Sequence, residues 1–385
     1  MAKDIIKLGD VATYINGYAF KPEDRGEEGL QIIRIQDLTG NSYDLGFYNG
    51  KYPKKIEIND GDVLISWSAS LGVYVWNGGK ALLNQHIFKV KFDKVDIDKS
   101  YFVYAVRYKL NDMGKKTHGA TMKHIVKRDF DATEIPYPPL KKQIEIAINL
   151  DKVLMVIKER KRELKLLDEL IKARFVEMFG DPATNPYNWD KINISEVVGD
   201  KVSNGFFAKR DDYADDGNVS VMGVAYIVNR MYSQWQDLPR TNGTDKDIEK
   251  FEVKYGDMLF CRSSLVAEGI GKASIVPEDV PQNTLFECHV IRLPLDLSKC
   301  VPEYMQVFST MEYFRRQIIA QSKTATMTTI GQDGILKADI LLPPMSKQRE
   351  FYAFVHQVNK SKVAVQKALD ETQILFDSLM QKYFG

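Results

Sequence analysis

The chain has 385 residues, of which 44% are hydrophobic and 27% are charged. These values are typical of a globular protein with room for two or more domains, and they exclude a disordered or collagen-like chain. The net charge of +1 does not by itself indicate a nucleic-acid partner, although local clusters of basic residues can still bind phosphates.

No run of 18 apolar residues could span a bilayer, and no apolar stretch follows Met1. We therefore expect a cytoplasmic protein with no membrane partner. Cys261, Cys288 and Cys300 form no Cys-x-x-Cys pair, which favours reduced thiols in that compartment.

The first part of the chain predicts a compact head of strands with few helices. Runs rich in β-branched and aromatic residues predict strands at 30–35, 63–67, 71–76 and 87–92, and a helix is expected at 101–111.

Between Arg107 and Arg128 there are seven Lys or Arg residues and one acid, Asp112. This stretch predicts a basic loop that contacts phosphates, and the alternative is a solvated charged face.

The middle and end of the chain each predict a long helix. After Pro138-Pro139 and after Pro343-Pro344, no Pro or Gly occurs until Phe179-Gly180 and Phe384-Gly385. Each interval leaves roughly 40 residues, or about 60 Å of helix. Between the helices, 181–187 is a predicted linker, strands are expected at 219–221, 258–261 and 290–293, and a helix is expected at 302–321.

An internal repeat organises the whole chain. The segment Ile135-Pro136-Tyr137-Pro138-Pro139 returns as Ile340-Leu341-Leu342-Pro343-Pro344, at a shift of 343 − 138 = 205 residues. Further matches, at other shifts, are Asn16-Gly17-Tyr18 with Asn204-Gly205-Phe206, and Gly61-Asp62-Val63 with Gly256-Asp257-Met258. We interpret the chain as one unit written twice, a variable mixed head followed by a long helix.

Both predicted helices carry an apolar seam with a seven-residue repeat, which favours coiled-coil packing. The seam residues are Leu150, Val153, Ile157, Leu164, Leu167, Ile171 and Met178 in the first helix, and Val355, Val358, Val365, Leu369, Phe376, Leu379 and Tyr383 in the second. We predict that the helices form an antiparallel two-helix coiled coil. In the alternative, each helix only covers the core of its own head.

Motifs for catalysis or metal binding are not found in the sequence. Asn185-Pro186-Tyr187 is a turn rather than a methyltransferase loop, and Gly269-Ile270-Gly271-Lys272 lacks the earlier glycine of a phosphate loop. Cys288-His289 has no second pair at metal-ligand spacing. We therefore expect no catalytic residue, no metal site and no cofactor in this chain.

The duplicated head–helix pattern resembles the specificity subunits of Type I restriction–modification enzymes. The resemblance rests on Gly119-Ala120-Thr121-Met122-Lys123-His124-Ile125, on Ile135-Pro136-Tyr137-Pro138-Pro139, and on their second copies at 324–330 and 340–344. It implies an α+β fold with two mixed α/β target recognition domains, a coiled-coil spacer and an internal pseudo-twofold repeat. The implied domains are 1–140 (first recognition domain), 141–180 (central spacer helix), 181–345 (second recognition domain) and 346–385 (distal helix, pairing with 141–180).

The resemblance also implies that this chain recognises DNA and that partner subunits carry out the catalysis. Each head recognises one half of a bipartite site in double-stranded DNA. Methylation subunits, expected in two copies, dock on the helices, and restriction subunits that combine motor and nuclease join them. S-adenosylmethionine, ATP and magnesium are expected on those partner subunits, where the catalysis takes place.

Polar and basic side chains near strand ends are the predicted DNA contacts, because such groups bond base edges and phosphates. In the first head they are Asn16, Tyr18, Lys21, Arg34, Gln36, Ser66, Ser68, Gln85, His86, Lys115, Lys116, Thr117, Thr121 and Lys123. In the second head they are Asn204, Phe206, Lys209, Arg210, Arg262, Ser263, Ser264, His289, Lys323, Thr324, Thr326 and Thr328. His86 and His289 could equally be core histidines, since each has apolar neighbours.

Three alternatives remain open at this point. The chain could serve a Type IIB or methyltransferase-only system with the same architecture. It could be an enzyme that acts alone, which the missing motifs oppose. It could also be an adaptor whose heads bind proteins.

Overall fold

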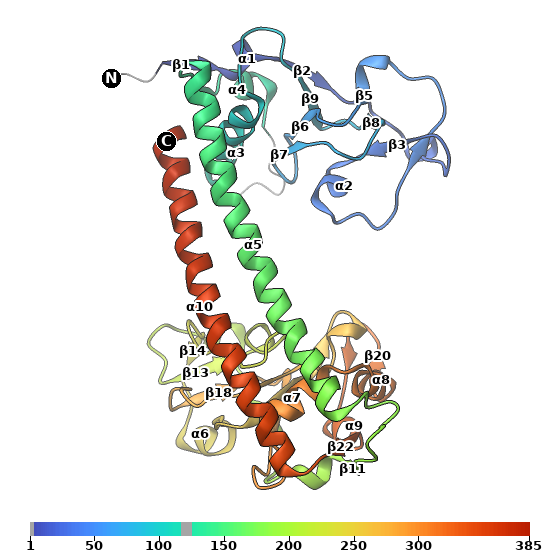
Figure 1. Cartoon of the computed structure of the whole chain (residues 1–385), viewed down its shortest axis with the longest axis vertical. Helices are drawn as coiled ribbons and strands as arrows, with labels where there is room; N and C mark the ends of the chain where they lie inside the picture. Colours follow the sequence, from blue (N-terminus) through green and yellow to red (C-terminus); the bar gives the residue numbers. More distant parts are fainter. Residues whose placement is uncertain (1–3, 117–124) are drawn as a thin grey trace. The chain divides into compact units, whose positions relative to one another are not determined.

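The computed structural model describes residues 4–116 and 125–385. The chain divides into two compact units (Figure 1). Unit 1 comprises Met1–Lys161 together with Lys367–Gly385, and unit 2 comprises Arg162–Gln366. Each unit thus contains one head and a segment of each long helix, and each has a mixed α/β composition.

Unit 1 is built on two four-stranded sheets. The first has the strand order β2 (Thr13–Asn16), β9 (Ile87–Lys91), β6 (Val63–Ser66), β7 (Gly72–Val75). The second has the order β4 (Phe47–Tyr48), β3 (Leu30–Ile33), β8 (Ala81–Leu83), β5 (Glu57–Ile58). A separate pair joins β1 (Ile5–Lys7) to β10 (Glu134–Pro136), and the helices are α1 (Leu8–Val11), α2 (Ile35–Thr39), α3 (Lys99–Lys116) and α4 (Lys127–Asp131).

The buried strands explain where the core of unit 1 lies. All four residues of β6 are buried, as expected for a strand with neighbours on both edges and cover on both faces. Ile33, Leu64 and Leu82 belong to one cluster of buried apolar side chains that joins the two sheets.

Unit 2 repeats much of this topology. Its largest sheet has the order β12 (Ser203–Asn204), β19 (Val290–Pro294), β15 (Asp257–Cys261), β17 (Ala273–Ile275). Smaller sheets have the orders β14 (Arg240–Thr241), β13 (Val219–Met222), β18 (Thr284–Phe286), and β16 (Ser263–Ser264), β21 (Thr328–Thr329), β20 (Lys323–Thr324). β11 (Asp190–Asn193) pairs with β22 (Asp339–Leu342), and the helices are α6 (Asp245–Phe251), α7 (Pro302–Thr310), α8 (Glu312–Ala320) and α9 (Gln332–Leu336).

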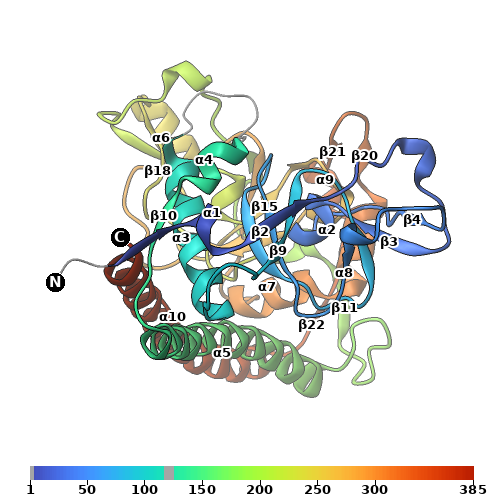
Figure 2. The same cartoon turned by 90° about the horizontal axis from the view of Figure 1, so that it is seen from above.

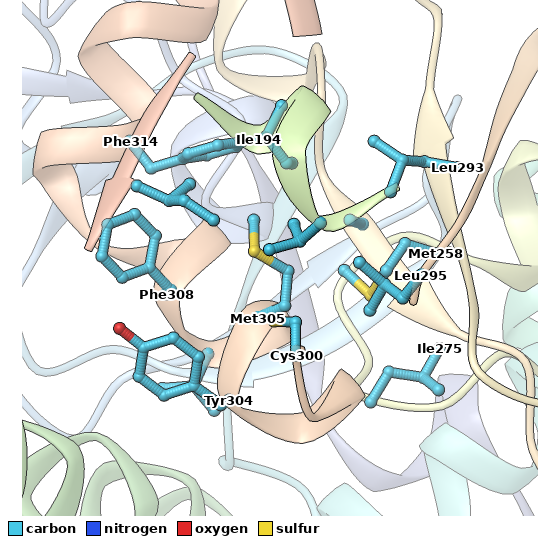
Figure 3. Packing of buried hydrophobic residues seen from close by; sticks show 14 of the residues in the cluster. Ile194, Met258, Ile275, Leu293, Leu295, Cys300, Tyr304, Met305, Phe308 and Phe314 are labelled. Atoms are coloured by element: carbon cyan, nitrogen blue, oxygen red, sulfur yellow. The ribbon is translucent and has the colours of Figure 1, made fainter. Parts of the chain in front are cut away.

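Aromatic and sulfur-containing side chains fill the core of unit 2 (Figure 3). Tyr304, Met305 and Phe308 of α7 are fully buried beside Met258 of β15. The Tyr304 hydroxyl donates to the carbonyl of Leu341 at 2.7 Å, so its polar end is satisfied inside the core.

The helix predicted at 302–321 is in fact two helices, α7 and α8, which meet at Met311. Met311 has extended backbone angles (φ −71°, ψ 146°). Just before it, the hydroxyls of Ser309 and Thr310 donate to the carbonyls of Gln306 and Val307. Such bonds compete with the backbone for helix carbonyls, which is consistent with the break.

The two long helices follow the proline pairs as the sequence predicts: α5 spans Leu140–Phe179 and α10 spans Met345–Phe384. Within each unit, Figures 1 and 2 show their segments side by side. In unit 2, Lys362 donates to Asp168 at 2.5 Å and Arg174 lies 3.5 Å from Glu350. Residue numbers rise on one helix as they fall on the other, so the segments are antiparallel.

Each predicted seam residue is buried or half-buried. Both helices also carry a second set of buried aromatic residues that the seam does not include. Phe175 of α5 and Phe351 of α10 lie 5.5 Å apart between ring centroids, and Phe175 stacks on Tyr304 of α7 at 5.4 Å. In unit 1, Phe384 of α10 lies 5.2 Å from Tyr101 of α3. The helices therefore pair with each other and also close the cores of the heads.

A buried glutamine fixes the first turn of each long helix to its head. Gln143 Nε2 donates to the carbonyl of Pro138 at 2.8 Å, and its Oε1 accepts from the amide of Asp98 at 3.0 Å. Gln348 does the same with Pro343 at 2.8 Å and Val301 at 2.9 Å. In the part of the chain that the structure describes, no helix is long and apolar enough to cross a membrane.

Candidate nucleic-acid interface

In unit 1, several predicted contact residues converge at one end of the first sheet. Asn16 pairs with Phe88 and Ser66 pairs with Ile87, so the last residues of β2 and β6 lie beside the first residues of β9. Gln85 and His86 directly precede β9. Antiparallel pairing thus brings together residues that are up to about 70 positions apart in sequence.

Backbone hydrogen bonds hold this strand end tightly. The amide of Gly17 donates to the carbonyl of Ile87 at 3.1 Å, and the amide of Trp67 donates to the carbonyl of His86 at 3.2 Å. A Cβ on Gly17 would lie only 2.0 Å from the carbonyl oxygen of Asn84, so only glycine permits this close approach. The Asn-Gly motif is therefore a packing requirement as well as a source of a polar side chain.

Unit 2 forms the corresponding strand end with the same kind of bonds. The amide of Gly205 donates to Val290 at 3.2 Å, and the amide of Arg262 donates to His289 at 2.8 Å. Nδ1 of His289 lies 3.2 Å from the Ser263 hydroxyl. Asn204, at the end of β12, pairs with Ile291 of β19.

A small sheet adds hydroxyl and ammonium groups to the strand end of unit 2. Ser263 pairs with Thr329 and Ser264 with Thr328, and β21 in turn pairs with Lys323 and Thr324. The structure thereby gathers Arg262, Ser263, Ser264, His289, Lys323, Thr324 and Thr328 from three separate segments. Of these, Lys323, Thr324 and His289 are exposed.

Four predicted contact residues are buried and are not available to touch DNA in this structure. Arg34 is 8% exposed, and its guanidinium donates to Asp37 at 3.0 Å, a bond that raises the pKa of Arg34. Ser66 donates to the carbonyl of Ser70, and Thr328 bonds the Thr324 hydroxyl at 3.0 Å. Ser68 is also buried. For these four, the prediction of direct contact is corrected: all four are buried, and Arg34, Ser66 and Thr328 also have internal hydrogen-bond partners.

The histidines are not core residues, since His86 is half-buried and His289 is exposed.

Four other predicted residues lie on segments away from the strand ends: Lys21 precedes a 3-10 turn (Pro22–Asp24), Gln36 is in α2, and Lys209 and Arg210 lie at a second 3-10 turn (Arg210–Asp212). Exposed or half-buried positions are held by Asn16, Tyr18, Gln85, Phe206 and Thr326.

The basic loop lies mostly outside the described residues. Thr117, Thr121 and Lys123 belong to that segment, and Lys115 and Lys116 are in the last turn of α3. Their predicted contact with phosphates stays a prediction.

Sequence reasoning missed Trp67. Its position corresponds to that of Arg262, because the match between Asp62 and Asp257 has a shift of 257 − 62 = 195 residues and 67 + 195 = 262. Applying this shift to the residue that directly follows β6 would have identified the pair.

The thiols of Cys261, Cys288 and Cys300 are not set up for nucleophilic catalysis. Burial raises the pKa of Cys261 and of Cys288, and it raises the pKa of Cys300 to about 12. Thiols with raised pKa values are weak nucleophiles at neutral pH. Over residues 4–116 and 125–385, no group of His, Cys, Asp and Glu side chains is arranged to hold a metal ion.

The architecture is that of a two-unit mixed α/β protein with a polar strand end in each unit. Residues 3–166 match the family described as the Type I restriction modification DNA specificity domain. The chain is 22% identical to the EcoBI specificity subunit of Escherichia coli, over 98% of this chain and 85% of that one. It is 24% identical to the EcoKI specificity subunit of Escherichia coli, over 99% and 88%.

Solved structures agree with this fold. The Type I S subunit from M. genitalium gives a TM-score of 0.53 at 12% identity, covering 100% of this chain and 96% of that chain. A chain from a structure of the assembly and conformational transition of a type I R-M system gives 0.55 at 15% identity, covering 99% and 97%. Residues 3–166 thus match the family model that the sequence leads us to expect, and almost the whole chain is similar to Type I specificity subunits.

Proposed function

We propose that this chain is the non-catalytic DNA sequence-specificity subunit of a Type I restriction–modification enzyme. Each head recognises one half of a bipartite double-stranded site. Catalysis takes place in partner subunits, which carry S-adenosylmethionine, ATP and magnesium.

One observation carries this proposal above the others. Each unit has a strand end where polar side chains from separate segments meet, and equivalent backbone bonds hold it in both units. A rigid edge that presents amide, hydroxyl, imidazole and basic groups can bond base edges and phosphates. Two such edges in one chain suit a bipartite site.

We further propose that α5 and α10 form an antiparallel coiled coil that sets the distance between half-sites, and that the two units are copies of one pseudo-twofold repeat. The buried seam and the contacts Lys362–Asp168 and Arg174–Glu350 support the pairing. The shared strand orders of the two units support the repeat.

The helices also have apolar side chains that face neither the seam nor a head. On α5, Ile144, Ile148 and Met155 are 42%, 47% and 59% exposed. Exposed apolar rows of this kind mark protein interfaces. They support docking of methylation subunits, in two copies, on the helices, with restriction subunits joining that assembly.

The first test combines binding with genome-wide methylation. The full chain, co-purified with its methylation subunits, should bind one bipartite duplex with an affinity that falls steeply with salt. The same sequence should be the methylated site in the source genome. Binding without sequence preference, or methylation by the chain alone, would contradict the proposal.

The second test concerns the spacer. Seven residues inserted between Lys161 and Arg162, and seven between Gln366 and Lys367, lengthen each helix by about 10.5 Å, or about three base pairs. We expect the preferred gap to lengthen while both half-sites stay the same. An unchanged gap would exclude the spacer role.

Two alternatives keep the same chain but change the assembly. A Type IIB or methyltransferase-only system would differ only in the subunits that co-purify. An adaptor that binds proteins through its heads would show no salt-sensitive binding to a single duplex.

A further inference from the structure

Trp67 and Arg262 occupy the same structural position in the two heads. Each directly follows the last residue of the central strand, β6 or β15, of its main sheet. The amide of Trp67 donates to His86 and the amide of Arg262 donates to His289, at 3.2 and 2.8 Å. Their carbonyls accept from the next returning segment, from Ile125 at 2.9 Å and from Ile330 at 3.0 Å.

The side chains at this position have different chemistry. Nη1 of Arg262 donates to the carbonyl of Cys288 at 3.0 Å, which fixes one end of the guanidinium. Within residues 4–116 and 125–385, this is the hydrogen bond that the guanidinium makes, and its Nε and Nη2 make none. Ser263 and the exposed His289 lie beside it. A held guanidinium with two donors free in a fixed fork suits the two acceptors, O6 and N7, that guanine presents in the major groove.

Trp67 offers an apolar wall instead. Its ring stacks on Phe88 at 5.6 Å and meets His86 at 4.9 Å between centroids. It lines an open hollow of about 260 Å³ with Asn16, Val126 and other residues, and Val126 is 53% exposed. The group that DNA offers to such a wall in the major groove is the C5 methyl of thymine.

We propose that Arg262 recognises a guanine in the half-site of the second head, and that Trp67, at the same position, makes an apolar contact with a thymine methyl group in the half-site of the first head. This inference rests on the proposed function. It makes the pair a specificity-determining position and gives each head a stated base preference.

The Arg262 part is tested in the complex of the full chain with its methylation subunits, on the duplex that the wild type selects. Arg262→Lys keeps the charge but removes the fork. We expect its affinity for the wild-type duplex to fall, by up to the about 5- to 150-fold that a bidentate pair is worth, and the preference for guanine at one position of the second half-site to weaken. Replacing that guanine by 7-deazaguanine, which lacks N7, should weaken the wild type more than the variant.

The Trp67 part uses deoxyuridine in place of each thymine of the first half-site. Loss of one methyl contact should weaken wild-type binding about 4-fold at a single position. Trp67→Phe should retain this sensitivity, whereas Trp67→Arg should lose it and favour a guanine there. Circular dichroism spectra and retention of the methylation subunits confirm that each variant is folded.

The outcomes separate the inference from the proposed function. If the wild type selects a bipartite site but Arg262→Lys lowers affinity equally for all sequences, Arg262 contacts a phosphate and the inference is wrong. If no thymine is sensitive, or Trp67→Arg leaves the first half-site unchanged, the Trp67 part is wrong. If the wild type selects no bipartite site, the proposed function is wrong, and the inference that rests on it is wrong as well.

Discussion

Replacing Gln348 with alanine should loosen the joint between α10 and the second head. The side chain is fully buried, accepts from the Val301 amide at 2.9 Å and donates to the Pro343 carbonyl at 2.8 Å. Alanine leaves both backbone groups buried without this partner, and each such group costs about 1–3 kcal/mol. Folding orders the glutamine side chain at an entropic cost of about 1 kcal/mol, and the alanine variant avoids this cost. The free energy of unfolding should therefore fall by about 3 kcal/mol.

Urea unfolding of the purified chain, followed by circular dichroism, measures this loss. Gln143→Ala removes the equivalent bonds to Asp98 and Pro138 and should cost a similar amount. Gln373→Ala, on the same helix as Gln348, removes only an exposed bond to Asp377 and should cost less than about 0.5 kcal/mol. If Gln348→Ala were no more destabilising than Gln373→Ala, the buried glutamine would not hold the joint.

Three further predictions concern stability and binding. Burial raises the pKa of Asp257 to about 6, so the folded chain binds this proton more tightly than the unfolded chain, and the free energy of unfolding falls by up to about 3 kcal/mol as pH rises from about 4 to about 6. Asp257→Asn should remove this pH dependence, which urea titrations at several pH values measure. Phe175→Ala should cost about 3–5 kcal/mol in the same assay, whereas Val176→Ala, at an exposed neighbour, should cost less than about 1 kcal/mol. The double change of Lys115 and Lys116 to alanine should weaken binding to every duplex alike and make the affinity less dependent on salt. Unchanged affinity at all salt concentrations would show that these two lysines do not contact phosphates.

The long helices could be predicted because their signals are local. Proline pairs mark their starts, and 3–4 spacing of apolar residues marks the seam. The break at Met311 could not be predicted in the same way. Ser309 and Thr310 are tolerated within helices, and only their bonds to the carbonyls of the preceding turn indicate that the helix stops there.

The candidate site was predicted in outline, because strand ends carry the polar residues of both heads. The sequence does not tell which polar residue finds an internal partner. Arg34 was predicted to contact DNA, but the chain folds back so that Asp37 and Asp44 surround its guanidinium. Trp67 was missed because an aromatic residue after a strand is usually part of a core, and its meaning depends on the comparison with Arg262 in the other head.

The boundary between head and helix follows from the same packing. The predicted second head, 181–345, ends where α10 begins, yet the compact unit that contains it extends from Arg162 to Gln366. The reason is that Phe175 and Phe351, one from each long helix, share a core with Tyr304. An exchange of heads between related subunits that cuts at 181 and 345 would join unrelated aromatic surfaces and expose this core. An exchange that cuts at 162 and 366 would transfer the core intact and divide only the seam, whose seven-residue repeat can be matched from one subunit to another. Under the proposed function, a head can therefore be exchanged only together with the helix segments that close its core.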